Sequence, residues 1–208
     1  MRLTDRDKDI IEAVYRYRIL RQDQIQRLFF GTAAAAQRVL VRLYDHTFLE
    51  RKFLPVYEGR SPTLYVLDKR GAELLRAERG HEDMVWYSSS KDLKPDFIEH
   101  TTAVNDFRIS VEVSAARFGL ELITWASEGQ LKSDYDRVTI PNAKRPVSLI
   151  PDSYFCLDTP FGRAHFFVEI DRGTETLERF KDKVRAYVNY HSSGAYERRY
   201  GTKSLRVL

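Results

Sequence analysis

Cysteine is almost missing from this chain of 208 residues, in which Cys156 is the single example. One cysteine cannot form a disulfide within the chain, and it cannot build a thiolate metal site by itself. The Cys and His spacing typical of a structural zinc site is missing too. Cys156 lies in an apolar segment, so we interpret it as a small buried hydrophobic residue.

Long apolar runs are also missing. No stretch approaches the roughly eighteen consecutive apolar residues that indicate a membrane-spanning helix. The first ten residues, MRLTDRDKDI, are charged and unlike the apolar centre of a signal peptide. We therefore expect a cytoplasmic protein that has no membrane partner.

The chain has only a small excess of positive charge. The chain has 34 basic and 30 acidic residues, which gives a formal net charge of +4. This excess favours a polyanionic partner only weakly, so the positions of the charges must decide. The length is enough for one full core or two small ones, and the patterns below favour two units of mixed α/β class, α+β overall.

The first eighty residues have the pattern of a winged helix-turn-helix. Thr4 and Asp7 have the spacing of a helix N-terminal cap, and apolar residues then recur at helical intervals. A turn that contains Gly59 and Pro62 separates two strand-like segments, which form the wing. The expected elements are a helix from about residue 5, helices over 22–30 and 33–45, strands over 48–57 and 64–67, and a helix over 69–79. We assign residues 1–80 to this DNA-binding domain.

The helix over 33–45 is the predicted reader of double-stranded DNA. Four alanines keep its first turn slim enough for the major groove, and polar side chains beyond them can reach bases and phosphates. The candidate DNA-binding residues are Gln37, Arg38 and Arg42 on this helix and Lys52, Arg60 and Ser61 on the wing. The plainer interpretation of each arginine is a solvated helix face.

The second half predicts the order α-β-β-β-α-β. Residues 81–97 lack periodicity and are interpreted as a linker, and 98–208 form the second domain. The expected elements are a helix over 98–118, strands over 120–126, 147–157 and 163–171, a helix over 175–191 and the start of a strand over 204–208. In the helix over 175–191, the residues expected to face inward are Leu177, Phe180, Val184, Tyr187 and Val188. Residues 127–146 are polar and carry no prediction.

Three carboxylates are expected to converge in this domain. Side chains alternate along a strand, so Glu169 and Asp171 share one face, and the hairpin partner can bring Asp152 beside them. Acids so close repel one another, which calls for a divalent cation, a lysine or raised pKa values. Mg²⁺, or Mn²⁺, is the natural candidate for ligation by Asp152, Glu169 and Asp171.

Several segments resemble the replication-relaxation family of plasmids and other mobile elements. The segments that carry the likeness are Leu3–Asp7, Leu64–Gly71, His100–Asp106, Pro151 with Asp152, Phe167–Thr174, and Lys183 with Tyr187. They cover nearly the whole chain. The resemblance implies a role in the replication or relaxation of DNA.

The second domain is similar to the PD-(D/E)XK, restriction-endonuclease-like superfamily. That likeness implies metal-binding acids at Asp152, Glu169 and Asp171, with a lysine that positions or activates the attacking water. Asp171 stands where the superfamily usually has this lysine, and Lys183 on the following helix is the candidate substitute. The candidate catalytic residues are thus Asp152, Glu169, Asp171 and Lys183.

Three functions stay open at this point. The protein is a metal-dependent nuclease that cuts or nicks DNA, a non-catalytic DNA-binding accessory or transcriptional regulator with a degenerate nuclease-like domain, or an interaction scaffold whose acids are structural. A second copy of the chain is a further candidate partner, in a homodimer.

Overall fold

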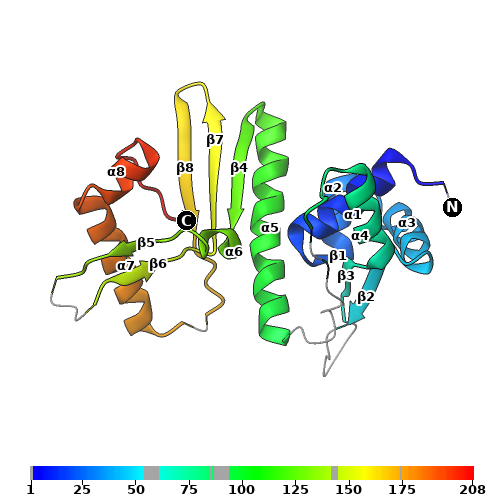
Figure 1. The fold of residues 1–208 in the computed structure, drawn as a ribbon, viewed down its shortest axis with the longest axis horizontal. Helices are drawn as coiled ribbons and strands as arrows, with labels where there is room; N and C mark the ends of the chain where they lie inside the picture. Colours follow the sequence, from blue (N-terminus) through cyan, green and yellow to red (C-terminus); the bar gives the residue numbers. More distant parts are fainter. Residues whose placement is uncertain (1, 54–60, 85, 87–93, 142–144, 174) are drawn as a thin grey trace. The chain divides into compact units, whose positions relative to one another are not determined.

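The computed structural model describes residues 2–53, 61–84, 86, 94–141, 145–173 and 175–208. Contacts divide the chain into two compact units, residues 1–110 and 111–208, and Figure 1 shows the elements of each. The mixed α/β class is confirmed, with small antiparallel sheets in both units. In the described part of the chain, no helix is both long enough and apolar enough to cross a membrane.

The helices and strands predicted for residues 1–80 occur in the predicted order, and a short strand and the start of a long helix are present in addition. The elements of the first unit are α1 (Asp5–Tyr17), β1 (Leu20–Arg21), α2 (Gln22–Phe29), α3 (Ala33–Asp45), β2 (Leu49–Phe53), β3 (Thr63–Leu67), α4 (Lys69–Glu78) and the first part of α5 (Pro95–Phe118). The Thr4 hydroxyl accepts from the Asp7 amide at 3.2 Å, and the Asp7 carboxylate accepts from the Thr4 amide at 2.9 Å, which confirms the predicted cap of α1.

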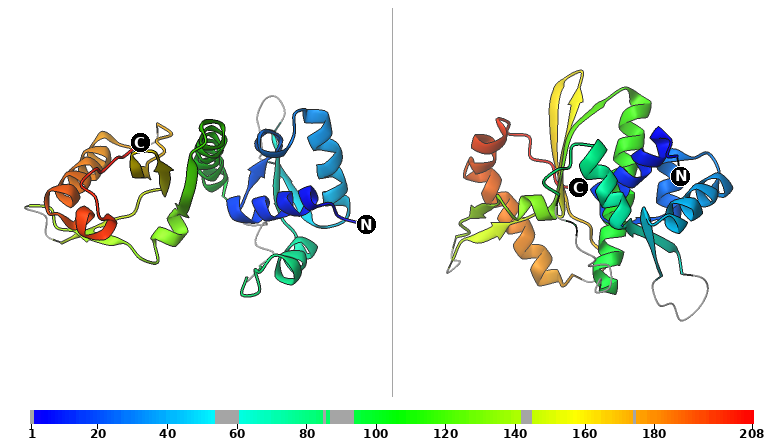
Figure 2. Two further views of the ribbon diagram at one scale, coloured as in Figure 1. Left: turned by 90° about the horizontal axis from the view of Figure 1, so that it is seen from above. Right: turned by 45° about the vertical axis from the view of Figure 1, so that its right-hand side comes forward.

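A three-stranded antiparallel sheet in the order β1-β3-β2 completes this unit. Helices α1, α3 and α4 enclose its core, in which Ile10, Ile11 and Leu40 are fully buried. Gly71 of α4 permits a close approach, because a Cβ atom there would lie 2.3 Å from the carbonyl oxygen of Phe48. The helices and this sheet can be followed in the two views of Figure 2.

The start of α5 belongs to the first unit. Asn105 is buried and donates to the carbonyl oxygens of Tyr17 at 3.2 Å and Ile19 at 2.6 Å. Gln24 of α2 donates to the Thr102 carbonyl at 2.8 Å. The linker expected over 81–97 therefore does not coincide with the division made by contacts, and α5 begins within it.

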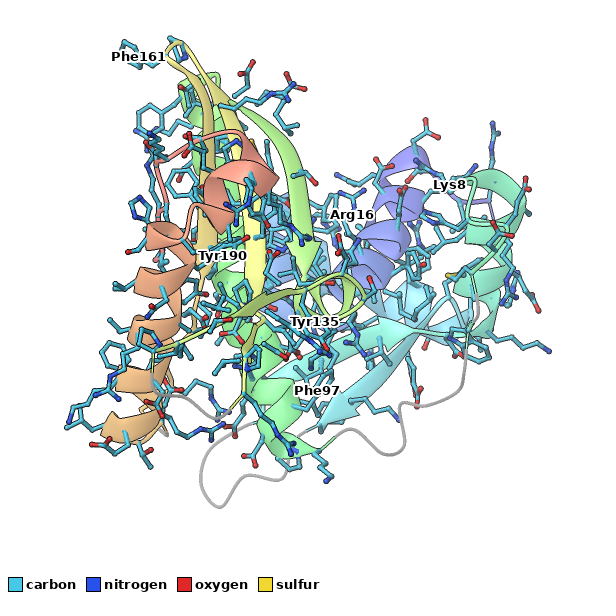
Figure 3. The ribbon with its side chains drawn as sticks, turned by 60° about the vertical axis from the view of Figure 1, so that its left-hand side comes forward. Lys8, Arg16, Phe97, Tyr135, Phe161 and Tyr190 are labelled. Carbon is cyan, nitrogen blue, oxygen red and sulfur yellow. The ribbon has the colours of Figure 1, made fainter. Side chains whose placement is uncertain are left out.

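The second unit is built on a sheet in the order β4-β7-β8. Its elements are the end of α5, β4 (Glu121–Ser127), α6 (Glu128–Leu131), β5 (Asp136–Val138), β6 (Val147–Leu149), β7 (Ser153–Thr159), β8 (Gly162–Val168), α7 (Leu177–Ser192) and α8 (Ala195–Tyr200). The chain end adds to the free edge, since Val207 pairs in parallel with Phe167. Phe161, fully exposed, marks the tip of the β7–β8 hairpin in Figure 3.

Two predicted strands are shorter than expected. The strand over 147–157 is two strands, because β6 pairs with β5 whereas β7 pairs with β8, and Pro151, which has no amide hydrogen to donate, stands between them. The strand over 163–171 ends at Val168. Helix α8 had no prediction, and α6 and β5 lie in the polar stretch 127–146, which carried none.

Five residues of helix α7 were predicted to face inward, and for four of them the prediction is wrong. Tyr187 is buried with Ala186 and Tyr190 against Phe167, Val138 and Leu149. The four residues found exposed are Leu177, Phe180, Val184 and Val188. The helix packs through a single face, and the apolar stripe lies beside that face.

Candidate functional site

Helix α3 presents the predicted outward residues at its start. The Thr32 hydroxyl accepts from the Ala35 amide at 3.3 Å and caps the helix. Ala36 and Leu40 point into the core, so Gln37 and Arg38 are left on the exposed side. This surface, formed by the slim first turn, Gln37 and Arg38, is called the α3 face below.

Arg42 has a structural partner, which the prediction of a DNA contact did not include. Its Nη2 atom lies 2.6 Å from Oδ1 of Asp7, and the Asp7 side chain is only 1% exposed. A buried carboxylate needs a charged partner, and Arg42 supplies it while keeping 43% of its own side chain exposed. Arg42 thus joins α3 to the capped start of α1.

Two of the three residues predicted on the wing have contacts within the hairpin itself. Lys52 forms an ion pair with Glu50 on its own strand. The Ser61 hydroxyl donates to the Pro62 carbonyl at 3.4 Å, and Arg60 lies outside the described residues. Arg51 carried no prediction, but its guanidinium lies 4.3 Å from the centre of the Tyr44 ring and so links β2 to α3.

In the second unit, strand pairing brings two of the predicted acids together. Ser153 at the start of β7 pairs with Val168 at the end of β8, so the next residues outward, Asp152 and Glu169, leave the sheet side by side. The Asp152 carboxylate also accepts from the Ile170 amide at 2.7 Å. The charge of Asp152 contributes to a rise in the pKa of Glu169.

Both oxygens of Glu169 have partners on α7. The Tyr187 hydroxyl donates to Oε1 at 2.5 Å, and Nζ of Lys183 lies 3.0 Å from Oε2. Burial raises the pKa of Glu169 above its ordinary range, and these two partners offset the rise only in part. The lysine predicted to replace the missing strand lysine therefore does reach the acid.

Lys183 also lies 3.2 Å from Oε1 of Glu175. Burial by itself would lower the pKa of Lys183, but the two glutamates outweigh burial and raise it, so this lysine stays charged. An open cleft of about 310 Å³ lies over these groups, and its lining includes Glu169, Glu175, Arg179 and Lys183. The cleft is lined by acidic side chains that could bind a cation and by basic side chains that could bind a phosphate.

Asp171 does not join this group. The strand ends at Val168, so the alternation that was to place Asp171 beside Glu169 does not continue. Its exposed carboxylate instead accepts from the Gly173 amide at 2.7 Å, in a turn where Gly173 has a φ of +73°. Within the described residues, no three His, Cys, Asp or Glu side chains are grouped so that they could hold a metal ion.

Asp152 and Glu169 have the residue type that could hold a magnesium ion. Mg²⁺ keeps several of its waters and is commonly held by one or two carboxylates. Each carboxylate oxygen has two lone pairs, so the bonds of Glu169 to Tyr187 and Lys183 leave acceptor capacity. Asp152 and Glu169 are therefore candidate ligands of Mg²⁺ or Mn²⁺, and the predicted third ligand, Asp171, is not beside them.

Comparisons with known proteins give one clear result. The search of curated proteins gave no match, and neither did the search of solved structures. The family model described as replication-relaxation matches residues 11–205, which is nearly the whole chain. The chain belongs to the replication-relaxation family.

Proposed function

We propose that this protein binds double-stranded DNA of a plasmid or other mobile element, in replication or relaxation, and hydrolyses a phosphodiester bond of that DNA. The observation that carries the proposal is the grouping of Glu169 with Lys183, which both line an open cleft, together with the charge of Asp152 acting on Glu169. Two acids and one lysine are the residue types of the nuclease site that the sequence resembles. The family membership supports a role in DNA replication or relaxation.

DNA binding is assigned to the first unit, as a winged helix-turn-helix. The support is the order of three helices and a hairpin, together with the exposed Gln37 and Arg38 on the α3 face. Such side chains, on a helix whose first turn is slim, suit base edges and phosphates of the major groove. The excess of basic residues agrees with a polyanionic partner.

The second unit supplies the proposed chemistry. Asp152 and Glu169 would hold Mg²⁺ or Mn²⁺, which supplies a Lewis acid and lowers the pKa of a bound water. Lys183, held by Glu169 and Glu175, would place a positive charge beside the reacting phosphate. Arg179, which lines the same cleft, would bind a neighbouring phosphate of the strand.

The test is cleavage of supercoiled plasmid DNA in the presence of Mg²⁺ or Mn²⁺. We expect the wild type to nick the plasmid and the variants Asp152→Ala and Lys183→Met to be inactive. Glu178→Gln is the matched control, because Glu178 is an acid on the exposed side of α7 and we expect it to retain activity. Equal activity of Asp152→Ala and wild type would exclude the proposed site.

A non-catalytic DNA-binding accessory protein is the second candidate function. It is favoured by the engagement of both Glu169 oxygens and by the exposed position of Asp171. In that case gel-shift experiments would show duplex binding, and neither Mg²⁺ nor Mn²⁺ would raise the melting temperature or produce nicked plasmid. A metal-dependent rise in melting temperature that Asp152→Ala abolishes would favour the nuclease.

A further inference from the structure

Arg51 of β2 is held between two aromatic rings. Strand β2 lies beside α3 (Figure 1), and the Arg51 guanidinium lies 4.3 Å from the centre of the Tyr44 ring on that helix. The Tyr65 ring of β3 is 5.9 Å away, and Tyr65 is the direct partner of Arg51 in the antiparallel pair. Both distances are typical of a cation–π contact. The two rings therefore limit the directions in which the guanidinium can point.

Arg51 has no carboxylate partner among the residues that the structure describes. Its Nε atom is buried there and donates to no acceptor. Burial raises the pKa of the Tyr65 hydroxyl and the charge of Arg51 offsets this rise only in part, so the nearby oxygen is a neutral one. Arg79 of the same unit, by contrast, lies 2.7 Å from an Asp9 oxygen. A partly buried cation and a buried donor without partners are unfavourable, and an anion from outside the chain would relieve the first.

Arg51 stands where the α3 face ends. Tyr44 follows Gln37 by seven residues, which is close to two helical turns, so its ring continues the line of the α3 face. This ring is 40% exposed, and Arg51 lies against it. If the α3 face occupies the major groove, the end of that face meets the backbone that borders the groove. The anion available at that place is a phosphate.

Lys52, the next residue of β2, is placed differently. Side chains alternate along a strand, so Lys52 points to the face opposite Arg51. Glu50 occupies the same face as Lys52, and the two form an ion pair. The charge of Lys52 is therefore balanced within the hairpin, whereas the charge of Arg51 has no such balance.

We propose that Arg51, supported by the Tyr44 ring, binds a phosphate of the DNA backbone at the end of the α3 face, and that Lys52 does not. A guanidinium suits this role because its planar donors match two phosphate oxygens. This inference rests on the proposed duplex binding by the first unit. It adds a backbone contact to the groove contacts assigned to Gln37 and Arg38.

The first test is a fluorescence-anisotropy titration of a mixed-sequence duplex at a series of salt concentrations. Arg51→Met should lower the affinity about tenfold, and the slope of log affinity against log salt should fall by about 0.9, the value for one phosphate. Lys52→Met is the matched control, because it also removes one positive charge from β2. We expect it to change the affinity and the slope much less. Equal results for the two variants would overturn the assignment.

Thermal unfolding without DNA separates binding from stability. Methionine keeps an apolar stem of similar length and removes the buried donor that has no acceptor, so Arg51→Met should not lower the melting temperature. A structural role for Arg51 gives the opposite pattern. A lower melting temperature together with unchanged duplex affinity would therefore overturn the proposal.

A second pair of variants leaves Arg51 in place. Tyr44→Leu should weaken duplex binding severalfold, because the guanidinium loses the ring that supports it, and Tyr44→Phe should bind as the wild type does. In an Arg51→Met background, Tyr44→Leu should cause little further loss, since the ring acts through Arg51. Additive losses would contradict this role of Tyr44.

The same titrations distinguish this contact from the proposed function. If Arg38→Ala weakens binding while Arg51→Met does not, the α3 face still binds DNA and only the contact of Arg51 is wrong. If the wild type binds no duplex at any salt concentration, the proposed DNA binding fails and the contact fails with it.

Discussion

Nζ of Lys183 lies 3.0 Å from Oε2 of Glu169, although the two residues come from different elements, α7 and the segment that leaves β8. The nuclease pattern that the sequence resembles would place its lysine two residues after the acid, where this chain has Asp171. Here the lysine arrives from the helix instead. A positive charge therefore lies beside Glu169 although no lysine follows it two residues later.

Glu169→Gln should alter how stability depends on pH. The pKa of Glu169 is raised by burial, so its contribution to stability is fully present below the ordinary glutamate value of about 4.5 and is lost as pH rises through the raised value. Glutamine does not ionise, so its contribution to stability does not change with pH in this way. We expect the unfolding free energy of the variant relative to wild type to increase as pH rises above about 4.5.

Urea unfolding at a series of pH values checks this expectation. Glu178→Gln is the control, since that residue lies on the exposed side of α7. Its difference from wild type should stay nearly constant over the same range. A constant or falling difference for Glu169→Gln would show that the carboxyl is not held in the buried site.

Two arginines on α3 should have separable effects. Arg38→Ala should weaken duplex binding by about 1–3 kcal/mol if the side chain contacts a base, without loss of stability, because Arg38 is exposed. Arg42→Ala should lower the unfolding free energy by about 1–3 kcal/mol, because it leaves the buried Asp7 carboxylate with one partner fewer. Fluorescence-anisotropy titration and urea unfolding of both variants test this; exchanged outcomes would contradict it.

Asp171→Ala should leave metal-dependent nicking close to the wild-type rate. Asp171 is exposed and bonded to the Gly173 amide, so its removal disturbs a turn but not the pair formed by Asp152 and Glu169. Asp152→Ala should lower the rate by about 100-fold or more. Initial rates of plasmid nicking compare the two, and equal losses would place Asp171 in the site.

Asn105→Ala should destabilise the first unit by about 1–3 kcal/mol. The variant loses the buried donor that satisfies the Tyr17 and Ile19 carbonyl oxygens. Ser110→Ala, on the exposed side of the same helix, loses a bond from Arg27 at 3.0 Å and should cost less than about 1 kcal/mol. Thermal unfolding of the two variants should therefore separate them clearly, and similar losses would mean that Asn105 does not anchor α5.

Much of the fold could be predicted because its signals are local. The capping pair of Thr4 and Asp7 marks the start of α1, and Thr32 marks the start of α3. Helical periodicity then predicted α3 over the residues that the structure gives it, 33–45. Such signals depend on neighbours within one helical turn, so a sequence contains them completely.

The candidate site was predicted only in part. Pro151 with Asp152, Glu169 and Lys183 were identified by pattern, but the strand end at Val168 removed Asp171 from the group. Tyr187 was predicted to face inward, yet its bond to Glu169 gave no signal in the sequence. Side-chain partners of this kind depend on strand register and on how a helix packs against the sheet, and the spacing of residues in the sequence predicts neither.

The sequence by itself determined most of the helices, the caps of α1 and α3, and two of the three proposed acids, because periodicity and capping act over a few residues. The tertiary structure decided which polar groups meet. Arg42 forms an ion pair with the buried Asp7, and Lys183 forms one with Glu169. Four apolar residues of α7 are exposed. These contacts form between segments that are far apart in the sequence. A buried charge needs a partner, and only the packing of those segments decides which residue that partner is.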